Sequence, residues 1–251
     1  MFKLIRTRIH QGYKTCNYPG KEVTLHPAFK GLPRLNLNCD QNIVEKCAAS
    51  CPQDAIDPGT RLIDLGRCVF CGLCERISKG EFIRFTNNFE LAATQRDHLI
   101  TDGNLPDIAA NAKKRFKDLF GRSLQLRQVS AGGCNACEAD TNVLNTPFYD
   151  LSRFGIQFVA SPRHADGLHV TGPVTRNMAR ALLMTYEAVP SPKLVIAAGS
   201  CAISGGPFRG SPEIIPLETL LPVDLYIPGC PPHPMTTLNA LIRYLKKDRS
   251  E

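Results

Sequence analysis

Two patterns of apolar and polar positions follow one another along the second half of the chain: helical spacing and short apolar runs. Helical spacing of apolar residues predicts helices directly after Cys137, over 174–188 and over 234–247. Short apolar runs that end near glycine or proline predict the strands between them, over 124–129, 154–160, 167–171, 193–198 and 223–227. Strands that alternate with helices favour a parallel sheet covered on both faces. We therefore expect an α/β fold with a flavodoxin-like sheet.

Three of these predicted strands run into loops that contain cysteine. Gly132-Gly133-Cys134, Gly199-Ser200-Cys201 and Pro228-Gly229-Cys230 each follow a strand. Ligands of parallel sheets bind at the carboxyl ends of the strands, so we expect the three loops to converge. Glycine lets the backbone approach inorganic sulfide closely, and proline fixes the loop.

The first third of the chain has a different character, because it holds seven of the eleven cysteines. Residues 91–122 are polar and contain no cysteine, with a turn predicted at 102–104 and a helix over 108–120 that ends at Gly121. We place a domain boundary near residue 100. It divides the chain into a small α+β domain, 1–100, and the α/β domain, 101–251.

Composition narrows the classes of function. No run approaches the roughly 20 apolar residues of a membrane span, and the basic start, 1–14, lacks the apolar core of an export signal. We therefore expect a cytoplasmic protein, in which thiols stay reduced and cysteines serve as metal ligands instead of disulfides. The net charge of +7 is scattered apart from 113–117 and 246–249, which favours solvated helix faces and subunit contacts over nucleic-acid binding.

One set of cysteines has the spacing of an iron–sulfur site. Cys68, Cys71 and Cys74 form a C-x2-C-x2-C run, whereas zinc sites usually bring separated pairs. In two-cluster ferredoxins such a run continues with C-x3-C-P, and its last cysteine ligates the other cluster. Cys47-Ala-Ala-Ser-Cys51-Pro52 matches the end of such a run. We therefore expect Cys51 to complete a [4Fe–4S] site.

The second ferredoxin cluster is expected to be missing. Its first two ligands would fall on Gln41 and Val44 and its remote ligand on Ser78, while Cys39 is two residues out of register. The cysteines outside both sets are expected to be free or buried thiols: Cys16, Cys39 and Cys47.

The second half resembles the small subunit of complex I-related, membrane-associated [NiFe]-hydrogenases of the formate hydrogenlyase type, and the 20 kDa (B-type) subunit of complex I. The resemblance covers 124 to about 245 and is carried by 133–138, 161–166, 171–175, 199–201 and 227–232. It implies a second [4Fe–4S] cluster, on Cys134, Cys137, Cys201 and Cys230.

This resemblance also indicates which kind of large subunit the chain would bind. In the family the cluster faces a large subunit that carries either a Ni–Fe centre or, in complex I, a quinone site. Complex I B-type subunits have two adjacent cysteines at the first position, whereas hydrogenase small subunits have CxxC. Cys134-Asn-Ala-Cys137 therefore favours the hydrogenase branch.

The first part of the chain resembles the separate ferredoxin-like subunit of the same complexes. The matching stretches include 18–19, 29–31, 51–52, 67–75 and 88–92. The resemblance implies a fusion of two neighbouring subunits that lacks one ferredoxin cluster. It also implies a peripheral place on the cytoplasmic side of the inner membrane, beside membrane-arm subunits and further iron–sulfur or donor subunits.

A few polar residues near the second set have two interpretations each. Glu138 follows a ligand and is a candidate for tuning the cluster potential or assisting proton movement, or else an ordinary acid at a helix N-terminus. A third candidate is a polar cluster, or knot, of Arg163, His164 and Asp166. It either lies near the large subunit or forms a structural salt bridge. His233 lies beside Cys230, but four cysteines already suffice as ligands.

Three functions follow. The first is a non-catalytic electron-transfer subunit of a hydrogenase, with two [4Fe–4S] clusters. The second is the equivalent subunit of a complex I-like (NADH:quinone oxidoreductase-related) module whose partner lacks nickel. The third, a zinc-stabilised nucleic-acid-binding protein, is disfavoured by the three-cysteine run and the scattered charge.

Overall fold

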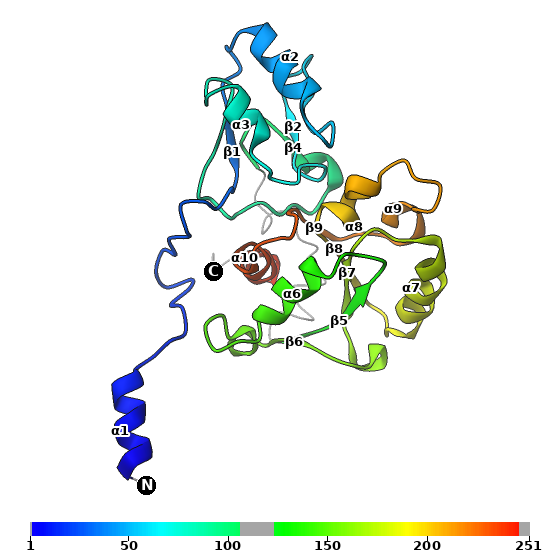
Figure 1. Cartoon of the computed structure of the whole chain (residues 1–251). Helices are drawn as coiled ribbons and strands as arrows, with labels where there is room; N and C mark the ends of the chain where they lie inside the picture. Colours follow the sequence, from blue (N-terminus) through cyan, green and yellow to red (C-terminus); the bar gives the residue numbers. More distant parts are fainter. Residues whose placement is uncertain (1, 106–122, 246–251) are drawn as a thin grey trace, which may run out of the picture.

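A five-stranded parallel sheet forms the centre of the second half (Figure 1). The structure is a computed structural model that describes residues 2–105 and 123–245. The strands lie in the order β6-β5-β7-β8-β9, which is the 2-1-3-4-5 order of flavodoxin-like sheets. Their bounds are β5 Leu124–Ser130, β6 Ile156–Phe158, β7 Gly167–Thr171, β8 Leu194–Ala198 and β9 Leu225–Ile227.

Helices cover both faces of this sheet. On one face, α7 (Arg176–Ala188) packs Ala179 and Leu182 against side chains of β7 and β8. On the other, α10 (Pro234–Leu245) packs a nearly continuous buried surface against β5, β8 and β9. The shorter helices are α6 Ala136–Val143, α8 Ser200–Ser204, α9 Leu217–Leu220, η2 Leu151–Phe154, η3 Pro162–His164 and η4 Gly206–Phe208. The predicted α/β fold is confirmed.

The first third is built from short elements around the first cysteine set. Two antiparallel pairs, β1 with β3 and β2 with β4, flank the two small helices α2 and α3. The Asp40 side chain caps α2 by accepting a hydrogen bond from the backbone N–H of Asn42 at 2.8 Å. The bounds are α1 Phe2–Gln11, β1 Pro33–Leu35, α2 Gln41–Ala49, β2 Ile63–Asp64, α3 Leu73–Ile77, β3 Ile83–Phe85, η1 Arg96–Leu99 and β4 Ile100–Thr101.

The two parts are joined by backbone and side-chain contacts. Ala93 and Tyr226 exchange two backbone hydrogen bonds, of 3.0 and 2.8 Å, so Ala93 covers part of the free edge of β9. Glu90 forms an ion pair with Arg243 and accepts a hydrogen bond from Asn239, both on α10. One apolar core also contains side chains from both parts. The division near residue 100 stays a prediction.

Some predicted bounds need correction. The strand expected over 154–160 is only β6, because a 3-10 turn ends at Phe154 and Gly155 follows it in the left-handed region, with φ 73°. The helix expected over 108–120 and the end of the helix expected over 234–247 lie outside the described residues. Within the described ranges no helix has the length and apolar character needed to cross a membrane.

Candidate iron–sulfur sites

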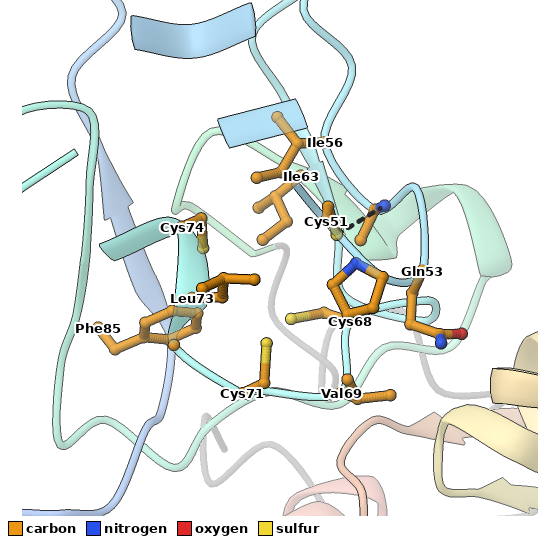
Figure 2. A pocket seen from close by; sticks show the side chains of 13 residues that line it. Cys51, Gln53, Ile56, Ile63, Cys68, Val69, Cys71, Leu73, Cys74 and Phe85 are labelled. Atoms are coloured by element: carbon orange, nitrogen blue, oxygen red, sulfur yellow. Dashed lines mark hydrogen bonds between the residues drawn. The ribbon is translucent and has the colours of Figure 1, made fainter. Parts of the chain in front are cut away.

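The four thiols of the first set line one small cavity. Figure 2 shows the sulfur atoms of Cys51, Cys68, Cys71 and Cys74 facing a common space. The remaining wall is largely apolar and includes Ile56, Ile63, Leu73 and Phe85. The structure therefore brings together all four cysteines that the sequence assigned to this site.

Two features of the backbone position these thiols at the cavity. The loop between Cys68 and Cys74 turns through left-handed residues at Phe70 (φ 54°) and Gly72 (φ 71°). A Cβ atom on Gly72 would meet only the flexible end of the Lys30 side chain, so the positive φ is what favours glycine at this position. The backbone N–H of Phe70 donates to the Cys68 sulfur at 3.3 Å.

Burial makes these thiols hard to ionise without a metal. Burial raises the pKa of the Cys74 thiol to about 12 and that of Cys68 still further. Metal ligation requires the thiolate, so binding of iron must drive the loss of these protons. Cys71 is exposed, which leaves one edge of the set open to solvent.

The thiols of the second set meet at the carboxyl ends of three strands, as the alternating pattern predicted. Cys134 follows β5, Cys201 follows β8 and Cys230 follows β9, and Cys137 lies in the first turn of α6. All four line one small cavity together with backbone from Gly133, Gly172 and Gly229. The convergence follows from the parallel order of the strands.

Glycines pack tightly against the sulfurs of this second set. A Cβ atom on Gly199 would lie 2.8 Å from the Cys137 sulfur, and one on Gly206 would lie 2.7 Å from the Cys201 sulfur. Both glycines have positive φ, at 91° and 53°. Backbone therefore surrounds the thiols at distances that a larger residue would prevent.

Thiols of the second set are also kept protonated by burial. It raises the pKa of Cys137 to about 12 and that of Cys201 to about 11, and the neighbouring acidic and thiol groups add to both shifts. Cys134 and Cys230 are exposed, so this set also has an edge open to solvent.

The two sets are connected by one buried side chain. The Ser200 hydroxyl donates to the Cys68 carbonyl at 2.7 Å and lies 3.1 Å from the Gly229 carbonyl. Ser200 precedes Cys201, so its hydroxyl joins the segment that carries Cys68 to the segment that carries Cys201. Sequence reasoning missed this contact, because no local pattern relates residues 132 positions apart.

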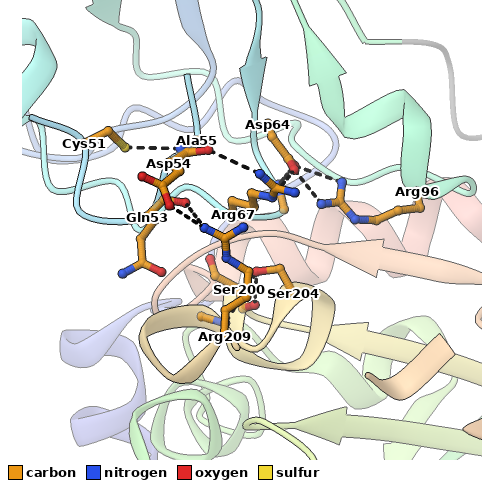
Figure 3. A network of polar contacts seen from close by, with 12 residues as sticks. Cys51, Gln53, Asp54, Ala55, Asp64, Arg67, Arg96, Ser200, Ser204 and Arg209 are labelled. Carbon is orange, nitrogen blue, oxygen red and sulfur yellow. Dashed lines mark hydrogen bonds and ion pairs between the residues drawn. The ribbon is translucent and has the colours of Figure 1, made fainter. Parts of the chain in front are cut away.

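Charged side chains support the same junction (Figure 3). Arg209, in the loop after η4, reaches Asp54 of the first part at 2.7 Å. Asp64 accepts from Arg96 at 2.6 and 2.9 Å and pairs with Arg67 at 3.2 Å. These ion pairs border the loops that carry Cys51 and Cys68.

The geometry of neither set is that of a single-ion site. Among residues 2–105 and 123–245, no group of three or more histidine, cysteine or acidic side chains is arranged to hold one metal ion. In a [4Fe–4S] cluster each thiolate binds a different iron, so the four ligands stand further apart than those of one ion. Sulfur-only donor sets favour iron–sulfur clusters or zinc.

The remaining cysteines lie outside both cavities. Cys47 is fully buried and donates to the Cys74 carbonyl at 3.4 Å, and Cys39 and Ser78 are close enough to affect its pKa. Val44 is also fully buried. Elsewhere, the Cys16 carbonyl accepts a hydrogen bond from Arg153 at 2.7 Å. All eleven cysteines are free of disulfides in the structure, so the expectation that these three hold no cluster stays a prediction.

Two polar residues singled out from the sequence are held by the protein itself. Glu138 is buried and accepts from Thr171 at 2.7 Å, and this bond and one with Ser130 keep its pKa below the ordinary value, although burial acts in the opposite direction. The His233 ring accepts from the backbone N–H of Met235 at 3.1 Å.

The side chains of the predicted polar cluster do not interact with one another as expected. The cluster consists of Arg163, His164 and Asp166. Asp166 accepts a hydrogen bond from the backbone N–H of Gln125 at 2.7 Å. Arg163 and His164 lie on η3, and neither is buried. In the described part of the chain no salt bridge joins the three.

Fold and sites define a class: an α/β protein with two sets of four thiols, each set around one small cavity. The family model described as "NADH ubiquinone oxidoreductase, 20 Kd subunit" matches residues 134–244. A probable membrane-bound hydrogenase subunit, mbhJ of Pyrococcus furiosus, is 44% identical over 139 residues, which are 54% of this chain and 83% of that protein. The chain therefore belongs to the family of complex I 20 kDa subunits and [NiFe]-hydrogenase small subunits, which confirms the resemblance inferred from the sequence.

Other relatives come from both branches. Formate hydrogenlyase subunit 7 of Escherichia coli is 40% identical, covering 56% of this chain and 54% of that protein. The B-type subunit of NADH-quinone oxidoreductase from Carboxydothermus hydrogenoformans is 46% identical, covering 46% of this chain and 70% of that protein. Among solved structures, the membrane-bound sulfane sulfur reductase, an archaeal respiratory membrane complex, has a chain that is 34% identical with a TM-score of 0.45, covering 55% of this chain and 78% of that one.

Proposed function

We propose that this chain relays electrons between a ferredoxin-type [4Fe–4S] cluster and the catalytic large subunit of a membrane-associated [NiFe]-hydrogenase. The first cluster would be held by Cys51, Cys68, Cys71 and Cys74. The second, on the side of the large subunit, would be held by Cys134, Cys137, Cys201 and Cys230. The observation that carries the proposal is the hydrogen bond from Ser200 to the Cys68 carbonyl, because it joins the segment that carries Cys68 to the residue that precedes Cys201.

The residues present fit such clusters. Each set offers four thiols around one small cavity, and left-handed glycines or backbone N–H groups approach the sulfurs. When bound, a [4Fe–4S] cluster supplies a one-electron redox centre. The protein's own contribution is to hold the thiolates, to exclude water from Cys68 and Cys74, and to fix the distance between the two sets through Ser200.

The exposed edges indicate where partners would bind. Cys134 and Cys230 leave the second set open, which suits a large subunit that must approach its cluster. Names of relatives include subunits of a membrane-bound hydrogenase and of formate hydrogenlyase. We therefore place this chain in an oxidoreductase complex, peripheral to the cytoplasmic side of the inner membrane, with membrane-arm and further iron–sulfur or donor subunits as partners.

A complex I-like module is the alternative. It is supported by the similarity to the NADH-quinone oxidoreductase relative. Cys134 and Cys137 are separated by two residues, which favours the hydrogenase branch. The two alternatives differ in the partner, since the nickel ligands would belong to the large subunit.

Metal analysis of the anaerobically purified chain tests the relay. Two clusters require about eight iron and eight sulfide per chain. Cys137→Ala and Cys71→Ala should each lower the iron content to about four, whereas the control Cys16→Ala should keep about eight. A zinc content without iron, or about twelve iron, would contradict the proposal. Co-purification with the large subunit then separates the alternatives: nickel and hydrogen oxidation support a hydrogenase, and neither is expected from a complex I-like module.

A further inference from the structure

The first helix exposes apolar side chains that nothing in the described structure covers. α1 stands apart from the body at the end of an extended segment (Figure 1), and none of its residues is buried. Phe2 is 90% exposed, Ile9 is 76% exposed and Ile5 is 52% exposed. An isolated helix of ten residues with this surface gains little stability by itself in water. The helix therefore needs a surface to cover it.

Three of the four apolar side chains of α1 lie on one side, and Leu4 lies outside this sector. At 100° per residue, Phe2, Ile5 and Ile9 point in similar directions, whereas Lys3 and Arg6 lie outside this sector. At the end of the helix, the Arg8 guanidinium lies 4.7 Å from the centre of the exposed Tyr13 ring and donates to the Gly12 carbonyl. The helix is thus amphipathic, with an aromatic side chain at its end.

The charge of this segment has a single sign. Among the first 21 residues there is no aspartate or glutamate, and the first acidic residue is Glu22. The cations of this segment are Lys3, Arg6, Arg8, Lys14 and Lys21. A helix with an apolar face and a basic polar face binds in the interface of a bilayer, and anionic lipid headgroups attract the cations.

We propose that α1 is an interfacial anchor that lies on a bilayer containing anionic phospholipid, with Phe2, Ile5 and Ile9 directed into the acyl region. Nucleic acid fits less well, because its phosphates would neutralise the cations and leave the apolar side uncovered. The inference rests on the proposed peripheral position in a membrane complex, but not on the electron relay. α1 would hold the basic end of the chain at the membrane while the folded body stays outside it.

Vesicle flotation with the full chain, loaded with iron, tests the anchor. The chain should float with vesicles of phosphatidylcholine and phosphatidylglycerol, and should float poorly with phosphatidylcholine alone or in high salt. The triple variant Phe2→Ser/Ile5→Ser/Ile9→Ser should lower partitioning by about 100-fold, since three apolar side chains no longer enter the bilayer. Leu4→Ser is the matched control: Leu4 is 76% exposed but lies off the apolar sector, so partitioning should change by less than about twofold.

Several outcomes would overturn the anchor. These are failure of the wild-type chain to float, flotation that does not depend on phosphatidylglycerol, and equal flotation of the triple variant. Binding that appears only with a membrane subunit present would assign α1 to a protein partner, and α1-dependent binding of duplex DNA without flotation would assign it to nucleic acid. Iron content, measured on the same samples, keeps this test separate: loss of flotation at about eight iron per chain leaves the relay intact.

Discussion

A methyl group at Gly199 should prevent binding of the proposed second cluster and leave the proposed first cluster bound. Gly199 directly follows β8, with φ 91° and ψ 152°, a region that essentially only glycine occupies. Its Cα also lies against the second set, so that the Cβ of an alanine would be 2.8 Å from the Cys137 sulfur. Gly199→Ala therefore combines backbone strain with a direct clash against a candidate ligand.

The two effects differ in size and in consequence. Backbone strain in this region costs about 1–3 kcal/mol, which a folded domain can tolerate. The clash is more specific, because relief to an ordinary contact distance of about 3.5–4.0 Å needs a movement of roughly 1 Å. Ligand distances in metal sites tolerate about 0.2 Å, so a displaced Cys137 sulfur could no longer complete the site.

Iron analysis and a matched glycine separate these effects. Gly210 also has positive φ, 84°, but a Cβ there would meet nothing within 4 Å. Gly210→Ala should keep about eight iron per chain and lower the Tm by about 2–6 °C, whereas Gly199→Ala should fall to about four iron. About eight iron in Gly199→Ala, or equal iron loss in Gly210→Ala, would refute the reasoning.

Two further predictions concern buried polar groups. Ser200→Ala leaves the Cys68 carbonyl without its hydroxyl donor and should cost about 1–3 kcal/mol in thermal or denaturant unfolding. Ser204→Ala is the control and should cost less, because its hydroxyl bonds only to nearby backbone, the carbonyl of Ser200 and the N–H of Gly206; equal losses would argue against a special role for the junction. His169 is fully buried, and burial lowers its pKa to about 4. The unfolded chain therefore binds the proton more readily than the folded chain as the pH falls. We expect the free energy of unfolding to fall by about 2 kcal/mol between about pH 7.5 and about pH 5. His169→Leu should flatten this dependence relative to the wild type, and an unchanged slope would show that other groups cause it.

The sheet and the second thiol set were predictable because their signals are local. The apolar runs at β7 and β8 are fully buried strands, and the cysteines that follow β5, β8 and β9 meet because parallel strands end at one edge. The first set was predictable from spacing alone. The structure groups the thiols of both sets, and their binding of iron stays a prediction.

The parts that escaped prediction depend on distant or missing contacts. Ser200 could not be linked to Cys68 from the sequence, since the contact depends on how the two halves pack. The pairing of Ala93 with Tyr226 is equally non-local. α1 escaped for the opposite reason: its apolar residues are few and covered by nothing in the described structure, so the pattern indicates only a basic start.

The thiols of both sets are unevenly buried, which fits the proposed relay. Cys68 is buried and its carbonyl accepts from Ser200, and Cys201, the residue after Ser200, is partly buried. Cys71 and Cys134 are exposed instead. A protein that only stored metal would gain nothing from such an arrangement, whereas a relay needs a fixed, covered connection inside and accessible edges for its partners. The ion pair of Arg209 with Asp54 adds a charged contact at the same junction, where the proposed relay would need a constant distance between the sets.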